Sequence, residues 1–418
     1  MLVYVLNKNG KPLMPCKQAK ARKLLRSRKA KMVKRTPFTI QLNWDCEDNI
    51  QKIILGVDSG YKTIGLSAVS DKQELFASEV KLRTDIKNLL AERRQYRRLK
   101  RNRLWYRKPR FLNRVKTKKK GWLAPSIKHK LNGHIKTVQL VSSILPISNI
   151  ILEVAAFDIQ KIKNPDISGA EYQNGEQAGF LNVREYVLHR DGHTCQACKG
   201  KSKDKILNVH HIIQRTDGGT DKPNNLITLC ETCHMAYHKG RIILKVKPPK
   251  EFKSETFMSM VRWKLVNILR DMGYVISHTY GYITKSARIA LKLTKSHIND
   301  AFCIAKGQIQ GRMENNYLIK LSRKCNRSLY KANLLRGGKR KRNTIKQAFG
   351  FQRFDKVLYS GIECFIYGLR SSGYFDIRSL IGGKIRDSVK YNKLKLIEYF
   401  KQWRIALIPA LTDRVFEL

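Results

Sequence analysis

The first fifty residues contain short apolar runs and one basic amphipathic stretch. Residues 2–6 and 38–42 are apolar or alternate in polarity, which predicts strands, and 17–33 has the spacing of a basic helix. A turn at Asn9-Gly10 separates the first strand from the segment Lys11-Pro12-Leu13-Met14-Pro15. These elements predict a small α/β domain over residues 1–50.

Three further apolar runs follow and are separated by tight turns. They cover 53–57, 64–69 and 75–82, and the first leads directly into Asp58-Ser59-Gly60. Three successive strands of this kind are typical of the opening of an RNase H type sheet. Apolar residues at helical spacing over 126–145 then predict an amphipathic helix.

The later part of the chain continues the α/β pattern and then loses it. A buried strand predicted over 150–154 contains Glu153, and a charge in a central strand usually needs a reason. Further elements are predicted after residue 250: helices over 256–272 and 296–309 with a short strand over 274–277 between them. Beyond residue 310 the pattern weakens to short β-like pieces.

The charge of the chain indicates a polyanionic partner. Lys and Arg number 84 against 32 Asp and Glu, so the formal net charge is +52. Repulsion of this size is tolerated when phosphates neutralise it, so we expect a nucleic-acid partner. An anionic membrane is the competing polyanion, but no run of about 18 apolar residues exists to span one. Met1 to Gly10 does not resemble a signal peptide, so we expect a cytoplasmic protein.

Four of the nine cysteines form two C-x-x-C pairs, Cys195-x-x-Cys198 and Cys230-x-x-Cys233. Four thiolates are the ligand set of a closed tetrahedral zinc site, and the remaining cysteines have unrelated spacings. This pattern predicts a structural Zn²⁺ in a reducing compartment, without a disulfide framework.

The segment between the cysteine pairs has the ββα order of an HNH nuclease finger. A strand is predicted over 208–213, a turn at Asp217-Gly218-Gly219, a second strand from Asn225 and a helix over 230–239. A hydrolytic nuclease needs an imidazole to take a proton from the attacking water and a divalent cation to stabilise the leaving oxygen.

Four histidines and one asparagine supply the groups for this chemistry. We expect His211 to be the general base and Asn225 to fix its tautomer. His210 points to the opposite side of the strand, because successive strand residues alternate faces, and His234 and His238 share one helix face. These three histidines are predicted to bind Mg²⁺ or Mn²⁺. A zinc ribbon that only binds nucleic acid would explain the cysteines but not this series.

A second centre is predicted from acidic residues far apart in the sequence. Asp58 ends a first strand, Glu153 lies in a later one, and His297 and Asp300 are three apart on a helix. An RNase H type nuclease needs acidic side chains from such elements to hold two cations at the scissile phosphate. Each residue alone is more often structural, but their order favours catalysis by Asp58, Glu153, His297 and Asp300.

A strongly basic segment separates the first strands from the rest of the sheet. In Arg93 to Lys120, 15 of 28 residues are Lys or Arg, with interleaved aromatic residues. Charge runs are usually solvated, but the aromatics and a possible helix from Leu89 to Tyr106 indicate a helix that grips RNA. The arginines predicted to bind nucleic acid are Arg93, Arg94, Arg97, Arg98, Arg101 and Arg103.

Assembled in order, these motifs resemble those of the IscB family, transposon-encoded RNA-guided nucleases related to the type II CRISPR effectors. The segment Lys11 to Pro15 looks like the family's PLMP motif, and Gly56 to Gly60 like its first RuvC motif. Arg93 to Arg114 is similar to its arginine-rich bridge helix, Glu153 lies in its second RuvC motif, and His297 to Ala301 matches the third. His210 stands where the CRISPR effectors carry Asp.

The resemblance implies an α/β multidomain architecture, in which an HNH domain of the ββα-metal type with a zinc knuckle is inserted in a split RNase H-like (RuvC) domain. The expected parts are a PLMP domain over 1–50, RuvC parts over 51–86, 123–165 and 251–310, a bridge helix with a basic segment over 87–122, the HNH domain over 166–250, and a C-terminal region over 311–418 that contacts guide RNA and reads the target-adjacent motif.

The resemblance further implies an RNA-guided DNA endonuclease that cuts both strands. His211 would cut the guide-paired strand and the RuvC residues the displaced one, with a structured omega RNA as guide and double-stranded DNA as target. The protein would work as a monomer in a prokaryotic ribonucleoprotein. Two alternatives remain: an RNA-independent homing endonuclease or resolvase-like nuclease, and a nucleic-acid-binding protein with inert sites.

Overall fold

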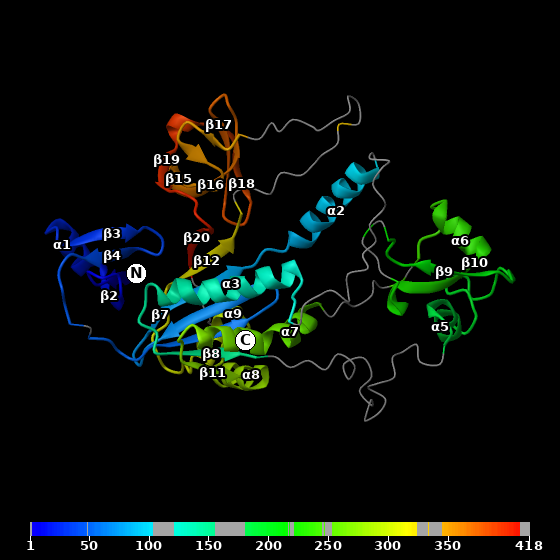
Figure 1. The fold of residues 1–418 in the computed structure, drawn as a ribbon, viewed down its shortest axis with the longest axis horizontal. Helices are drawn as coiled ribbons and strands as arrows, with labels where there is room; N and C mark the ends of the chain where they lie inside the picture. Colours follow the sequence, from blue (N-terminus) through cyan, green and yellow to red (C-terminus); the bar gives the residue numbers. More distant parts are fainter. Residues whose placement is uncertain are drawn as a thin grey trace, which may run out of the picture. The chain divides into compact units, whose positions relative to one another are not determined.

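The computed structural model describes residues 2–47, 49–102, 121–154, 180–215, 217, 221–244, 246, 253–323, 333 and 345–409. The chain divides into two compact units (Figure 1). The first is formed by Met1–Ala156 together with Phe257–Leu418, and the second is the inserted segment Phe157–Thr256. The chain therefore leaves the first unit after Ala156, builds the second, and returns to the first at Phe257.

The N-terminal residues form a four-stranded sheet with one helix. The sheet has the order β2-β1-β4-β3, and its elements are β1 (Leu2–Leu6), β2 (Pro12–Lys17), α1 (Gln18–Arg26), β3 (Ala30–Lys34) and β4 (Thr39–Leu42). The helix predicted over 17–33 was too long. Arg28 has a positive φ of 55°, and β3 then pairs with β4, so sheet pairing overrides the helical spacing after Arg26.

A seven-stranded sheet forms the centre of the first unit. Its order is β11-β8-β5-β6-β7-β12-β20. The strands are β5 (Ile54–Ser59), β6 (Thr63–Val69), β7 (Glu74–Lys81), β8 (Asn149–Glu153), β11 (Ile276–Thr279), β12 (Asn315–Leu321) and β20 (Trp403–Pro409). β5, β6 and β7 are antiparallel neighbours, whereas β8 and β11 run parallel to β5. Every strand predicted before residue 280 is present.

Helices cover both faces of this sheet. α3 (Pro125–Ser142) and α7 (Lys253–Asp271) pack on the face that carries Leu55, Val57 and other apolar side chains of the main core, and Figure 1 shows α3 lying across the sheet. α9 (His297–Ile304) packs on the other face, beside α8 (Gly281–Ala290). The sequence predicted α3, α7 and α9 but not α8, and α9 ends five residues earlier than the predicted 309.

Two glycines allow α9 to approach the sheet closely. A Cβ at Gly56 of β5 would lie 2.1 Å from the Ala301 carbonyl oxygen, and one at Gly65 of β6 would lie 1.9 Å from that of His297. No larger side chain fits at either position without moving the helix. Because Gly56 and Asp58 point to the same face of β5, this close contact brings the first turn of α9 to Asp58.

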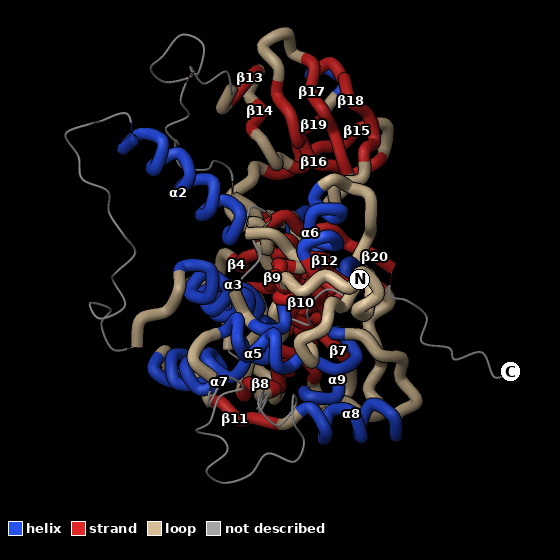
Figure 2. Tube along the Cα trace, turned by 90° about the vertical axis from the view of Figure 1, so that its right-hand side faces the viewer, coloured by secondary structure: helices blue, strands red, loops and turns tan. Residues whose placement is uncertain are grey.

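The region after residue 310 is more regular than the sequence indicated. β12 and β20 complete the seven-stranded sheet, so that sheet extends past the boundary expected at 310. Between them lie a five-stranded sheet of order β18-β17-β16-β15-β19 and a small hairpin (Figure 2). Their elements are β13 (Gln347–Ala348), β14 (Phe351–Gln352), β15 (Lys356–Tyr359), β16 (Ile362–Leu369), β17 (Tyr374–Arg378), β18 (Lys384–Lys390), η3 (Tyr391–Lys393) and β19 (Lys395–Glu398).

The inserted unit is small and has the predicted ββα order. Its elements are α5 (Val183–Arg190), β9 (Leu207–His211), the 3₁₀ turn η2 (Pro223–Asn225), β10 (Leu226–Cys230) and α6 (Glu231–His238). β9 and β10 pair antiparallel, with His211 opposite Leu226. Asn225, expected to begin the second strand, instead ends η2.

Helix α5, which was not predicted from the sequence, is hydrogen-bonded to the β9–β10 hairpin through Arg190. Arg190 donates hydrogen bonds to the carbonyl oxygens of Pro223 and Leu226, at 2.7 and 2.9 Å. Its neighbour Asp191 accepts a hydrogen bond from the Thr228 amide at 2.8 Å. These contacts hold η2 and β10, and therefore Asn225, in place.

The basic helix α2 (Ile86–Asn102) follows β7. It includes Arg93, Arg94, Arg97, Arg98 and Arg101, whereas Arg103 and the basic residues to 120 lie outside the described residues. Within the described part of the chain, no helix has both the length and the apolar character needed to cross a membrane.

Candidate functional site

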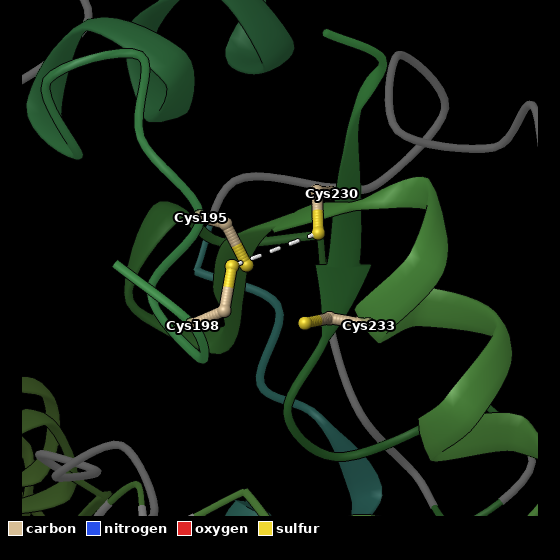
Figure 3. Close-up of side chains that lie close together, drawn as sticks. All are labelled: Cys195, Cys198, Cys230 and Cys233. Carbon is tan, nitrogen blue, oxygen red and sulfur yellow. Dashed lines mark hydrogen bonds between the residues drawn. The ribbon is translucent and has the colours of Figure 1, made fainter. Parts of the chain in front are cut away.

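The four predicted cysteine ligands converge in the inserted unit. Cys195 and Cys198 come from the loop after α5, and Cys230 and Cys233 from the junction of β10 and α6 (Figure 3). Their sulfur atoms all lie within 4.8 Å of one another, and those of Cys198 and Cys230 are 3.8 Å apart. Tetrahedral Zn–S bonds of about 2.3 Å place two sulfurs about 3.8 Å apart, so this donor set fits Zn²⁺.

The unit's apolar core is too small to explain its fold alone. Among the described residues it consists of Cys195, Ile227, Leu229 and Cys230, with partly buried neighbours that include Cys198 and Cys233. All four cysteines thus belong to the core. A unit with so small an apolar core usually needs a metal or a disulfide for stability, and a zinc ion held by these thiolates would serve that purpose.

The three histidines predicted to bind a cation also converge. The donor atoms of His210, His234 and His238 lie within 4.8 Å of one another, and the Nε2 atoms of His234 and His238 are 3.3 Å apart. We call these residues the histidine cluster. His210 is buried, and its Nε2 has no hydrogen-bond partner in the described structure.

The electrostatics of the histidine cluster suit a divalent cation. Burial, and then the neighbouring imidazoles of His234 and His238, lower the pKa of His210 to about 4. His210 is therefore neutral near pH 7, as a metal ligand must be. A buried ring nitrogen without a hydrogen-bond partner, gathered with two further imidazoles, is a donor set that a divalent metal cation would satisfy.

The predicted base lies on the other side of β9. His211 is partly exposed, and its Nε2 is 2.8 Å from Oδ1 of Asp221, which also accepts a hydrogen bond from Arg215 Nε at 2.8 Å. These contacts lower the pKa of the Asp221 carboxyl, with His211 the largest cause. Asp221 was not singled out in the sequence, because an acidic residue ten positions from a histidine in a loop carries no pattern.

Asn225 supports the loop that follows His211. Its Oδ1 accepts a hydrogen bond from the Ile213 amide and its Nδ2 donates one to the Ile213 carbonyl, both at 3.0 Å. The backbone amide of Ile212 also donates to the Asn225 carbonyl at 2.8 Å. These bonds fix the backbone just after the base. The direct contact of Asn225 with the His211 ring stays a prediction.

The second predicted centre gathers at the ends of β5 and β8. Nδ1 of His297, at the start of α9, lies 2.6 Å from Oδ2 of Asp58 at the end of β5. Asp300 lies one turn further along α9 and forms an ion pair with Arg288 of α8, at 2.8 Å. Glu153 ends β8, next to β5. We call Asp58, Glu153, His297 and Asp300 the carboxylate site.

In the carboxylate site, burial and the repulsion between the acidic groups raise the pKa of two of the carboxyls. Burial, and then the charge of Asp58, raise the pKa of Glu153 to about 7 and also raise that of Asp300. The hydrogen bond to Asp58 raises the pKa of His297. Such mutual repulsion is what a bound divalent cation would relieve.

The fit to a cation is less complete here than in the histidine cluster. Among the described residues, Asp58, Glu153 and Asp300 do not form a set with all donor atoms within 4.8 Å. Asp58 and Asp300 instead have His297 and Arg288 as partners, and Thr284 of α8 hydrogen-bonds to Glu153. Arg288 and Thr284 could not be found from the sequence, because α8 itself was not predicted.

The arginines predicted to bind nucleic acid lie along α2. Arg94, Arg97 and Arg98 are exposed, and Arg93 is partly exposed. Arg93, Arg97 and Arg101 are four residues apart and share one face of the helix. A helix that exposes a row of guanidinium groups is suited to phosphate contacts.

Two family models match the chain. An HNH endonuclease model matches residues 195–240, and an RRXRR protein model matches residues 3–175. The HNH match begins at Cys195, ends just after α6, and includes both the four cysteines and the histidine cluster.

Curated relatives match over short segments. The chain is 33% identical over 65 residues to Anaredoxin of Nostoc sp., covering 15% of this chain and 82% of that protein. It is 39% identical over 61 residues to a probable HNH endonuclease of Lactococcus phage SK1, 13% of this chain and 64% of that one. A type IV methyl-directed restriction enzyme of Escherichia coli, EcoKMcrA, is 32% identical over 66 residues, 14% of this chain and 24% of the enzyme.

Solved structures of Streptococcus thermophilus Cas9 in complex with PAM sequences also match. Two of them, with AGAA and GGAA PAMs, have TM-scores of 0.29 and sequence identities of 14% and 16%. They cover 44% and 43% of this chain, which spans only 26% of either Cas9 chain.

Proposed function

We propose that this metal-dependent DNA endonuclease, whose residues 195–240 match an HNH endonuclease model, is an RNA-guided nuclease of the IscB type that cuts both strands of its target. The observation that carries the proposal is that one chain holds two separate sets of candidate catalytic groups: the histidine cluster with His211 in the inserted unit, and the carboxylate site in the first unit.

In the inserted unit, each residue has a distinct task. His211 takes the proton from the attacking water, and Asp221 orients its ring and stabilises the imidazolium that forms. The histidine cluster would hold a Mg²⁺ or Mn²⁺ ion, which supplies charge stabilisation at the phosphate. Asn225 and Arg190 hold the backbone on which these groups depend. The four cysteines would bind Zn²⁺ and stabilise the unit.

The carboxylate site supports a second, RuvC-type activity. Its sheet places the first three strands in the antiparallel order β7-β6-β5 and adds β8 and β11 parallel to β5. Acidic residues come from β5, β8 and a later helix, as an RNase H type nuclease requires. We infer that Asp58, Glu153 and Asp300 hold two Mg²⁺ ions, and that His297 orients Asp58 and takes part in proton transfer.

RNA guidance is supported by charge and by α2. A net charge of +52 exceeds what a small DNA-nicking domain needs. The arginine-bearing helix α2 follows β7 of the seven-stranded sheet in the sequence and precedes α3. We infer that this helix grips a structured guide, the omega RNA, and that residues 311–418 contact the RNA and the target-adjacent motif. The protein would act as a monomer in the ribonucleoprotein.

Strand-specific nicking tests the two-site assignment. The purified ribonucleoprotein should linearise a guide-matched plasmid in Mg²⁺. His211→Ala should abolish cutting of the guide-paired strand, and Asp58→Ala that of the displaced strand, each lowering one rate by at least about a hundredfold. End-labelled strands separate the two rates.

The controls distinguish the alternatives. Cleavage by RNA-free protein would favour a homing endonuclease or resolvase-like enzyme, and binding without cleavage in Mg²⁺ or Mn²⁺ would favour an inert binding protein. Loss of both nicks in either single variant would contradict two independent sites.

A further inference from the structure

Four exposed aromatic rings form a continuous row beside the carboxylate site. They belong to Trp263 of α7, His278 of the edge strand β11, and Tyr280 and Tyr282 at the start of α8. Successive ring centroids are 5.4, 5.7 and 6.2 Å apart. Trp263 is 44% exposed and Tyr282 is 71% exposed. Aromatic side chains gathered on the surface in this way are not explained by the core.

The row leads directly to a catalytic carboxylate. β11 pairs in parallel with β8, with Thr279 opposite Glu153. The next residues are Tyr280, Gly281 and Tyr282, and a Cβ at Gly281 would lie 3.1 Å from Oε1 of Glu153. The two tyrosines therefore flank the backbone that adjoins Glu153. Their rings are nearly parallel, with an interplanar angle of 8°.

We propose that Trp263, His278, Tyr280 and Tyr282 form a stacking surface for unpaired bases of the DNA strand that enters the carboxylate site. A nuclease that cuts a displaced strand must hold it without reading its sequence. Aromatic rings do so, because every base has a π-face. Exposed Lys285, one turn into α8, and the overall positive charge supply the attraction for phosphates. That the bound strand enters the carboxylate site rests on the proposed function, whereas the binding of unpaired bases by the four rings does not.

The test must separate stacking from the general attraction of a basic protein for DNA. We would measure binding of the full-length protein, with its copurified RNA and without added Mg²⁺ or Mn²⁺, to oligothymidylate and to an abasic oligomer of equal length. Only the first offers bases, while both carry the same phosphates. The ratio of the two affinities reports stacking and is insensitive to salt.

The matched variants differ only in the aromatic character of two side chains. Tyr280→Leu with Tyr282→Leu should reduce the preference for oligothymidylate at least about tenfold, without weakening abasic binding. Tyr280→Phe with Tyr282→Phe should retain the preference, and so should Ile283→Ala, a change in the neighbouring exposed residue. An unchanged preference in the leucine variant, or equal weakening for both oligomers, would overturn the stacking surface.

Cleavage data then distinguish this proposal from the proposed function. In the guided reaction, the leucine variant should slow cutting of the displaced strand and leave that of the guide-paired strand unchanged. If Asp58→Ala left displaced-strand cutting intact while the leucine variant still lost its base preference, the RuvC-type assignment would fail and the stacking surface would stand.

Discussion

The histidine cluster and the carboxylate site bring ligands together in opposite ways. In the first, three imidazoles gather within 4.8 Å, and one buried nitrogen has no partner among the described residues. In the second, acidic groups remain further apart, and Asp58 and Asp300 are paired with His297 and Arg288. Neutral ligands can be packed together by the fold alone, whereas carboxylates that crowd one another need a counter-charge.

The inserted unit should depend on its metal for folding, and this is the largest effect we expect. Cys230→Ser removes one of four thiolates that also form the core. Zinc binding contributes about 10–16 kcal/mol in comparable peptides, so the variant should lose its zinc and the folded inserted unit. Zinc analysis and hydrogen exchange across residues 180–244 would measure both.

The first unit should be unaffected by that change, because it has its own core. Displaced-strand cutting would therefore persist. Cys16→Ser, which alters a half-buried thiol of the N-terminal sheet, serves as the control and should leave zinc content at the wild-type level. A Cys230→Ser protein with a protected inserted unit would show that the apolar core suffices.

The guanidinium of Arg288 should supply, in the carboxylate site, positive charge that a bound metal cation would otherwise supply. Arg288→Met leaves the largely buried Asp300 without its ion pair and should lower the free energy of unfolding by about 1–3 kcal/mol. Added Mg²⁺ should recover part of this loss, because a cation relieves the same repulsion. Urea unfolding of the first unit with and without Mg²⁺ measures the difference.

An exposed ion pair provides the comparison for Arg288. The side chains of Lys8 and Asp45 are paired at 3.0 Å and are 55% and 73% exposed, so Lys8→Met should cost at most about 1 kcal/mol with no Mg²⁺ dependence. Equal behaviour of the two variants would remove the contrast between the carboxylate site and an ordinary surface pair.

Asp221 should have the smallest effect of the three. It lies at the surface and contacts His211 without contacting the histidine cluster in any described hydrogen bond. Asp221→Ala should slow guide-paired-strand cutting about 10-fold to 100-fold, through poorer orientation of the base, and leave zinc content unchanged. Strand-specific rates measure it, with Asp217→Ala, an exposed loop carboxylate, as control. A fall as large as that of His211→Ala would make Asp221 part of the proton transfer itself.

Local sequence patterns predicted the elements that hold the metal ligands, because the ligands have short spacings within or directly after those elements. Cys-x-x-Cys spacing, the paired His210-His211 and the i, i+4 pair His234 and His238 are all short-range features, and the structure gathers them. The strand ends at Asp58 and Glu153 were equally predictable from apolar runs followed by a polar residue.

The partners of those ligands were not predictable, because they are set by tertiary contacts. Asp58 and His297 are 239 positions apart, and Arg288 belongs to α8, a helix that was not predicted from the sequence. The sequence indicated short β-like pieces after residue 310, but not that five of them pair into one sheet, because strand pairing is set by tertiary contacts. The helix predicted over 17–33 was shortened by strand pairing, a preference that local spacing cannot reveal.

The position of β20 determines the order in which the protein can be completed during synthesis. All proposed catalytic residues lie before residue 301, yet β12 at 315–321 remains an open sheet edge until residues 403–409 pair with it. The inserted unit, whose last described helix ends at His238, has its whole sequence exposed long before that. During translation, the inserted unit can therefore fold before the seven-stranded sheet is complete. A chain truncated before residue 403 would carry a folded inserted unit and a seven-stranded sheet with an unpaired edge at β12.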